Sequence, residues 1–214
     1  AQLLECLPEE VEFDGEKVYL VNGDKSVSLA DIATKSQVNN LIPVDVTATY
    51  SSPVSPPPYM VGMVEIELDK ETGSIEILDY QAVIDCGIPV NPNLARVQAE
   101  GGIGQGIGMA LYENVTYNAQ GKIAENSFMQ YKIPTRLDMG RINVEFETSY
   151  EPSGPFGVKS IGEIVIKTPA PALAHAIYRA TGVWQRTVPF TPEKILMSML
   201  DPQWKEIDRR VKES

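Results

Sequence analysis

A chain of 214 residues with 43% hydrophobic and 22% charged residues has ordinary globular composition, which excludes a disordered or fibrous protein. Its formal net charge of -11, with Lys and Arg scattered along the chain, would repel a polyphosphate and argues against nucleic acid as a partner. No apolar run approaches the ~20 residues that a membrane-spanning helix needs. We therefore expect a soluble protein with no nucleic acid and no membrane among its partners.

The chain has two cysteines, Cys6 and Cys86, which lie far apart in the sequence and form no CxxC pair. This spacing indicates neither a disulfide scaffold nor a cysteine metal site, and a reducing cytoplasm fits it best. The sequence starts with AQLLECLPEE and has no initiator Met. We interpret the chain as a processed subunit or a piece of a longer polypeptide.

The N-terminal part predicts a small unit of its own. Residues 1–7 read as the remnant of a helix, and residues 11–29 as a hairpin because DG and NG dipeptides favour tight turns. A short helix follows, with Ser28 as its N-cap. The segment TATYSSPVSPPPYMVG, residues 47–62, is too rich in Pro and Ser for regular structure and is the best internal boundary.

This organisation predicts an N-terminal hairpin and helix over residues 1–43 and a C-terminal domain over residues 44–214. In the second part, alternating apolar and polar residues from 61 to 87 predict a long antiparallel hairpin with Gly73 in its turn. Its buried face is expected to comprise Val64, Ile66 and Leu68. After Pro92 the apolar spacing becomes helical, through Leu94, Val97, Ile103, Ile107 and Leu111.

Further elements follow in order: a small hairpin over 113–125, a longer strand over 141–151 and a loop over 152–163. The Ala-rich run 167–182 predicts a helix with Pro171 in its first turn and Gly182 at its C-cap. A last helix is capped by Thr191 with Pro192 in its first turn, and the residues after it are expected to fray. The fold class is therefore α+β, with mixed or antiparallel strands and packed helices.

Glycines at 102, 104, 106 and 108 stand out within QAEGGIGQGIGMALYE, residues 98–113. No G-x-G-x-x-G or G-K-[ST] can be placed on this spacing, so a nucleotide-binding loop is disfavoured. The alternative is a helix that lies close against other backbone, since glycine in a helix otherwise costs about 0.5–1 kcal/mol relative to alanine. Gln98 and Gln105 on a buried helix would then need hydrogen-bond partners from the backbone or from a ligand.

The loop PFGVKSIGE offers a candidate acid–base group. It could be a surface turn in which Lys159 and Glu163 are solvated. Alternatively, Glu163 lies between apolar neighbours, and partial burial of its carboxylate would suit a general base. The single histidine, His175, is interpreted as a packing residue on an Ala-rich helix, so no protein-ligated zinc site is expected.

Three stretches together resemble the molybdenum hydroxylases, the family of xanthine dehydrogenase and aldehyde oxidase. They are VIDCGIPVNPNLARVQAEGGIGQGIGMALYE, GPFGVKSIGEIVIKTPAPALAHAIYRATG and PFTPEKIL, with the hairpin VEIELDKETGSIEI before them. Their order and spacing match the last part of the family's molybdopterin-binding region, from about Val44 onward. The resemblance is closest to xanthine dehydrogenase-like members and implies their molybdopterin-binding fold.

The resemblance implies specific roles. Glu163 would be the catalytic base, Gly162 would lie beside the metal, and Gln98 would contact the pterin. Molybdenum in this family is held by the pterin's dithiolene, so no side chain is expected to ligate the metal. The implied cofactor is molybdopterin with molybdenum, in the cytosine dinucleotide form of bacterial-type members. The glycine helix would pass near it, with its missing side chains making room.

The resemblance also implies partners, because the family's other cofactor-contacting segments, iron–sulfur domains and flavin domain are not in this sequence. They are expected on the remaining molybdenum-subunit sequence and on iron–sulfur and FAD subunits, and this chain alone should be inactive. The implied substrate is a small electron-poor heterocycle such as a purine, with nicotinate-like rings or aldehydes as alternatives. Two positions depart from the family pattern: Ile164 replaces a common Pro, and KSIGE replaces KGVGE. Rival hypotheses are a non-catalytic binding or assembly module and, on poorer spacing, a nicotinamide-dependent dehydrogenase.

Overall fold

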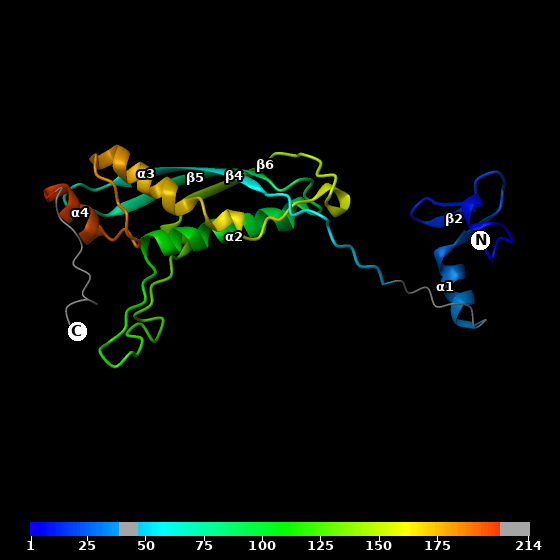
Figure 1. Cartoon of the computed structure of the whole chain (residues 1–214), viewed down its shortest axis with the longest axis horizontal. Coiled ribbons are helices and arrows are strands. Elements are labelled where there is room, and N and C mark those ends of the chain that lie inside the picture. The colour runs from blue at the N-terminus through cyan, green and yellow to red at the C-terminus, as the bar shows by residue number, and fades with distance from the viewer. Residues whose placement is uncertain (39–46, 202–214) are drawn as a thin grey trace. The chain divides into compact units, whose positions relative to one another are not determined.

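The computed structural model describes residues 1–38 and 47–201, and the chain divides into two compact units, Ala1–Ser51 and Ser52–Ser214. The division falls within the Pro- and Ser-rich segment (Figure 1). Residues 39–46 and the frayed end expected after the last helix lie outside the described residues.

The first unit is a three-stranded antiparallel sheet followed by a helix. Its elements are the 3-10 turn η1 (Pro8–Glu10), strands β1 (Val11–Phe13), β2 (Lys17–Leu20) and β3 (Ser26–Ser28), and helix α1 (Leu29–Val38). The hairpin expected over 11–29 is confirmed, and a third strand, β3, pairs with β2. Ser28 is the N-cap, because its Oγ accepts a hydrogen bond from the Asp31 amide at 3.1 Å. The helix expected over residues 1–7 is wrong: these residues form turns, and Glu5 has a φ of 55, which a right-handed helix does not allow.

The second unit has two layers, a three-stranded sheet and the helices that cover one of its faces. The sheet contains β4 (Tyr59–Leu68), β5 (Ile75–Asp85) and β6 (Arg141–Phe146), in the order β4-β5-β6. The helices are α2 (Pro92–Leu111), α3 (Pro169–Thr181) and α4 (Pro192–Leu200), with short 3-10 turns η2 (Arg136–Asp138), η3 (Pro155–Gly157) and η4 (Ile164–Ile166). Figure 1 shows α2 and α3 running along the sheet.

The β4–β5 hairpin is antiparallel as expected, whereas β6 pairs parallel to β5, with Ala82 opposite Gly62 on one side and Val144 on the other. Gly73 lies in the hairpin turn at φ 77 and is buried. Alternation along the strands turns one set of side chains toward the helices and the other outward. The inward set includes the expected Val64, Ile66 and Leu68, which pack against the core.

The core lies between the sheet and the helices. Its largest fully buried side chains are Tyr80, Ile84, Ile103, Ile107, Leu173, Ile177, Ile195, Val144, Val165 and Pro169. Tyr80 satisfies its hydroxyl there by donating to Thr168 Oγ1 at 2.9 Å. Both expected C-terminal helices are present: Gly182 ends α3 at φ 76, and Thr191 Oγ1 accepts from the Lys194 amide at 3.3 Å. Helix α3 begins at Pro169, so Pro171 lies in its first turn as expected.

The small hairpin expected over residues 113–125 is present in a minimal form. It consists of one antiparallel bridge between Tyr117 and Ile123, with the Asn118 amide donating to Lys122 O and the Ala124 amide donating to Thr116 O, both at 2.9 Å. Residues 113–125 project from the body of the unit as a long loop (Figure 1). Because Tyr117 is 60% exposed and Ile123 is 46% exposed, apolar packing that would extend the two strands is missing.

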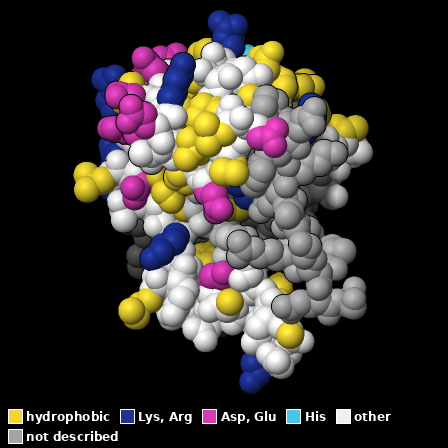
Figure 2. Space-filling model, turned by 90° about the vertical axis from the view of Figure 1, so that its left-hand side faces the viewer, with side chains coloured by type: hydrophobic (Ala, Val, Ile, Leu, Met, Phe, Trp, Pro, Cys, Tyr) yellow, Lys and Arg dark blue, Asp and Glu magenta, His cyan; other side chains and the backbone are white. Residues whose placement is uncertain are grey.

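The surface carries charges of both signs. On the face in Figure 2, acidic and basic side chains are interspersed, with hydrophobic side chains exposed between them. Among the described residues, no helix is both long enough and apolar enough to cross a membrane.

Candidate functional site

The candidate site begins where β5 ends. The chain turns at Gly87, whose φ is 72, and pairs with the loop after η3 through an isolated antiparallel bridge to Val158. The amide of Lys159 donates to Cys86 O at 2.7 Å, and the amide of Ile88 donates to Gly157 O at 2.9 Å. These bonds join two segments about 70 residues apart in the sequence. A side chain on Gly87 would crowd the Lys159 amide, so only glycine fits this approach.

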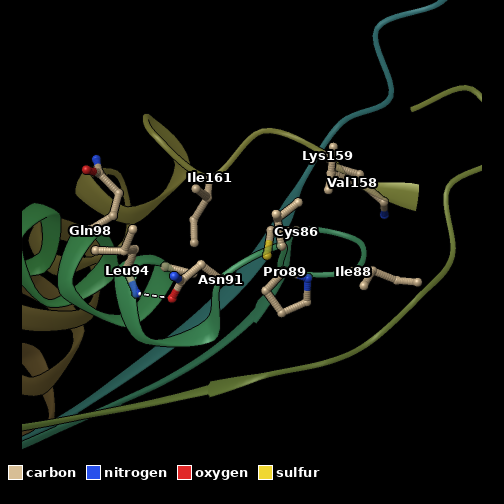
Figure 3. Close-up of a pocket in the computed structure, with 11 residues that line it drawn as sticks. Cys86, Ile88, Pro89, Asn91, Leu94, Gln98, Val158, Lys159 and Ile161 are labelled. Carbon is tan, nitrogen blue, oxygen red and sulfur yellow. Dashed lines mark hydrogen bonds between the residues drawn. The ribbon is translucent and has the colours of Figure 1, made fainter. Parts of the chain in front are cut away.

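Helix α2 begins beside this junction. Asn91 is its N-cap, with Oδ1 accepting from the Leu94 amide at 3.1 Å (Figure 3). The glycine run lies inside the helix, as the apolar spacing predicts.

The helix glycines pack against protein on two sides. A Cβ on Gly102 would overlap the side chain of Val165 in η4, and a Cβ on Gly106 would lie 2.6 Å from Pro169 Cγ. A Cβ on Gly104 would lie 2.9 Å from the sulfur of Met139. The close-packing interpretation is therefore confirmed for these positions. The expectation that their missing side chains make room for a cofactor is wrong, because protein already fills that space.

Gly101 differs from the other helix glycines, since no heavy atom lies within 4 Å of its hypothetical Cβ. The same is true of Gly162. Gln98 lies three residues before Gly101 in α2, and its Nε2 donates to Gly162 O at 3.4 Å. The structure thus brings together two of the three predicted site residues, from α2 and from the KSIGE loop.

The third predicted residue, Glu163, follows Gly162 directly and precedes η4. The expectation that its carboxylate is partly buried is wrong for this chain, because Glu163 is exposed. The short turn of η4 directs Val165 onto the bare backbone at Gly102 and leaves Glu163 on the outer side. Gln98 and Gln105 are also exposed, although the sequence suggested a buried helix face.

A cavity of about 360 Å³ opens between the start of α2, the turn after β5 and the KSIGE loop. Its lining is mainly apolar, and Figure 3 shows Gln98, Leu94 and Ile161 on one side and Lys159 and Val158 on the other. Cys86 is buried at its floor, and burial raises the pKa of that thiol. Glu163 is two residues from Ile161, so the cavity lies beside the loop that bears the candidate base.

Lys159 is not a solvated surface residue, because its side chain is 9% exposed and forms an ion pair with Asp85 at 2.6 Å. Asp85 also accepts from Ser149 Oγ at 2.7 Å and from the Gly87 amide at 3.0 Å. The Lys159 ammonium first, and then the Ser149 hydroxyl, lower the pKa of Asp85 to about 2. Asp85 was not predicted from the sequence. A charged residue that ends an alternating strand directly before a Cys-Gly turn is the signal that could have found it.

The remaining candidates lie outside this constellation. His175 is exposed on α3 instead of packed in the core, and it stacks on Trp184 with ring centroids 5.9 Å apart. Glu65 and Glu67 of β4, Glu145 of β6 and Glu147 directly after β6 are exposed to solvent. Residues 1–38 and 47–201 contain no cluster of three or more His, Cys, Asp or Glu that could hold a metal ion.

The site fits a flat, polar-edged group better than a bare metal ion. Gly101 and Gly162 present backbone without side chains to open space, so a ring could approach closely there. Gln98 is exposed beside Gly162 and has an amide able to donate and accept hydrogen bonds. These features suit a pterin and supply no ligand set for a metal bound directly by the protein.

Comparison with known proteins agrees with this geometry. The family of molybdopterin cofactor-binding domains matches residues 1–140. The probable hypoxanthine oxidase XdhD of Escherichia coli is 38% identical over 186 residues, covering 84% of this chain and 19% of that protein. The gamma subunit of the 6-hydroxypseudooxynicotine dehydrogenase complex of Paenarthrobacter nicotinovorans is 34% identical, covering 91% of this chain and 26% of that subunit.

Among solved structures, quinoline 2-oxidoreductase from Pseudomonas putida 86 superposes with a TM-score of 0.78 at 28% identity, over 93% of this chain and 27% of that one. The chain belongs to the molybdenum hydroxylase family and corresponds to a molybdopterin-binding part of it. The α+β fold expected from the sequence is confirmed. The chain spans only 19% to 26% of the length of these curated relatives.

Proposed function

We propose that this chain supplies the catalytic base and a pterin contact to a xanthine dehydrogenase-like hydroxylase, which oxidises a purine or a related N-heterocycle with oxygen derived from water. The observation that carries the proposal is the hydrogen bond between Gln98 and Gly162. Gln98, proposed to contact the pterin, therefore lies next to the loop that bears Glu163, which supports the proposal. Ile161, two residues before Glu163, lines the apolar cavity, and the exposed carboxylate of Glu163 is free to accept a proton from a reactant.

Gln98 and the bare backbone at Gly101 and Gly162 would hold the cofactor. The cofactor, proposed to be molybdopterin in its cytosine dinucleotide form, supplies the two-electron oxidation when bound. The residues of this chain orient the reactants and move the proton. Glu163 accepts the proton released from the water-derived oxygen as that oxygen is transferred to substrate. Closure of the cavity by other parts of the enzyme would desolvate the carboxylate, which is exposed in this chain alone.

The remaining molybdenum-subunit sequence is proposed to complete the site, and iron–sulfur and FAD subunits to accept the electrons. The relatives support this arrangement, since their names include a complex subunit and a large chain. With the rest of the site on other sequence, this chain alone is expected to be inactive, and the complete enzyme to be cytoplasmic.

A purine-type substrate is favoured because the probable hypoxanthine oxidase is 38% identical. The second candidate is a pyridine-type or aldehyde substrate, favoured by the similarity to a nicotine 6-hydroxylase subunit and to an aldehyde oxidoreductase subunit.

The test is Glu163→Gln in the complete enzyme, assayed with hypoxanthine, nicotinate and an aromatic aldehyde. Loss of a general base lowers kcat by about 100- to 10,000-fold, while molybdenum content stays at the wild-type level. Glu145→Gln is the matched control, because it removes the same charge from an exposed strand position. Comparable turnover in Glu163→Gln and the wild type would show that this residue is not the base. A native enzyme without molybdenum would instead favour a binding or assembly module.

A further inference from the structure

The loop that presents Glu163 is held at two places. On its C-terminal side, Val165 is fully buried against the bare backbone of Gly102, and Gly162 O accepts a hydrogen bond from Gln98. On its N-terminal side, the backbone and the side chain of Lys159 are both attached to the end of β5. The four residues after Lys159 that lead to Glu163 extend over about 14 Å at most, so these attachments restrict where the carboxylate can lie.

The attachment at Lys159 is stronger than an ordinary surface ion pair. The pair is mostly buried, with side-chain exposures of 9% for Lys159 and 20% for Asp85. Asp85 is itself fixed by the Ser149 hydroxyl and the Gly87 amide, and the Lys159 ammonium lies 5.5 Å from the centroid of the Tyr59 ring. Breaking a buried pair leaves the remaining charge without its partner, which is costly.

A second ion pair on the same sheet provides a contrast. Arg141 and Asp79 lie 3.7 Å apart, and the Arg141 side chain is 77% exposed. An exposed pair of this kind contributes about 0–1 kcal/mol and fixes little geometry. It lies on the sheet itself and is not attached to the KSIGE loop.

We infer that the Asp85–Lys159 pair is a positioning device, which holds residues 159–163 against the end of β5 and so sets where the carboxylate of Glu163 lies. Lys159 and Asp85 are positioning residues and take no part in proton transfer. The inference rests on the proposed role of Glu163. It adds that the strand end at Asp85, 78 residues earlier in the chain, controls the geometry of the base.

The test uses Lys159→Met, Lys159→Arg and Arg141→Met in the complete enzyme, compared at equal molybdenum content. Hydrogen exchange of residues 159–163, followed by mass spectrometry, reports on the loop without reference to activity. In Lys159→Met we expect exchange at least 10-fold faster there, a 10- to 100-fold lower kcat and a KM within about threefold of the wild type. Lys159→Arg, which retains the charge, should keep the exchange rate and the kcat close to those of the wild type. Arg141→Met should leave both the exchange of residues 159–163 and the kcat unchanged.

Unchanged exchange and unchanged kcat in Lys159→Met would overturn the inference. If Lys159→Met fails to assemble, Asp85→Asn replaces it, because an amide oxygen can still accept from Ser149 and Gly87 while the charge is lost. Failure of both variants to assemble would assign the pair to folding and would also overturn the inference. Glu163→Gln separates the two proposals. Full turnover in this variant would refute the proposed function, and the hydrogen exchange measured in Lys159→Met would not change that conclusion.

Discussion

Two adjacent glycines in α2 give a direct test of how this helix packs. Alanine at either position gains helix propensity of about 1 kcal/mol over glycine. At Gly101 nothing lies within 4 Å of the new Cβ, so Gly101→Ala should stabilise the chain by about 0.5–1 kcal/mol. At Gly102 the new Cβ overlaps Val165 Cγ2 and comes within 3.0 Å of Val165 Cβ. Overpacking of this kind costs about 1–3 kcal/mol.

Because the propensity gain is shared, the difference in free energy of unfolding between the two variants isolates the packing cost. Gly102→Ala should therefore be about 1–3 kcal/mol less stable than Gly101→Ala. Equilibrium urea unfolding of the two variants, with matched m-values, measures this difference. Val165→Ala removes the overlapping methyl group, so it should relieve most of the cost when combined with Gly102→Ala.

Equal stability of Gly101→Ala and Gly102→Ala would refute the packing of η4 on α2. The absence of any coupling between Gly102 and Val165 in the double variant would do the same. Since Val165 lies two residues after Glu163, the expected displacement should also lower kcat in the complete enzyme.

Two further predictions concern polar groups in the second unit. Asp85 has a folded pKa of about 2, below its ordinary value of 3.8, so its pair with Lys159 contributes stability in full above about pH 5 and loses it as the pH falls toward 2. Asp85→Asn should flatten this part of the stability curve in acid unfolding by about 1–2 kcal/mol, more than an exposed pair contributes, and an unchanged curve would contradict the assignment. Tyr80→Phe should lower the free energy of unfolding by about 1 kcal/mol, because it deletes the hydrogen bond to Thr168. Adding Thr168→Val to Tyr80→Phe should lower it by less than Thr168→Val does alone, and a double-mutant cycle followed by thermal unfolding would measure this.

Most of the fold was predicted from the periodicity of apolar residues in the sequence. The alternation over 61–87 and the helical spacing after Pro92 predicted elements whose two faces are physically distinct, one buried and one wet. The parallel pairing of β6 with β5 was not accessible in this way, because strand direction depends on the path of the chain through α2 and the long loop. The hairpin over residues 113–125 was predicted from its local turn residues, but its short length was not, because that depends on packing that is absent around Tyr117 and Ile123.

The candidate site was predictable only in part. Glu163 was proposed first from its apolar neighbours and then, with Gly162 and Gln98, from the resemblance, and the structure brings Gln98 and Gly162 into contact. Burial of the Glu163 carboxylate was wrongly inferred from its apolar neighbours, since a short 3-10 turn sends successive side chains in different directions. The Asp85–Lys159 pair could not be read from the sequence, because nothing local connects residues 74 positions apart.

The long loop after α2 separates the two halves of the site along the chain. Gln98 and Asp85 come before it, whereas Lys159 and Glu163 come after it. Its tip at Gly121 is exposed, and no heavy atom lies within 4 Å of the position that a Cβ would take there. A break in the backbone at this tip would leave every described hydrogen bond of the site intact. The constellation is therefore suited to reassembly from two complementing fragments, each of which holds one half of it.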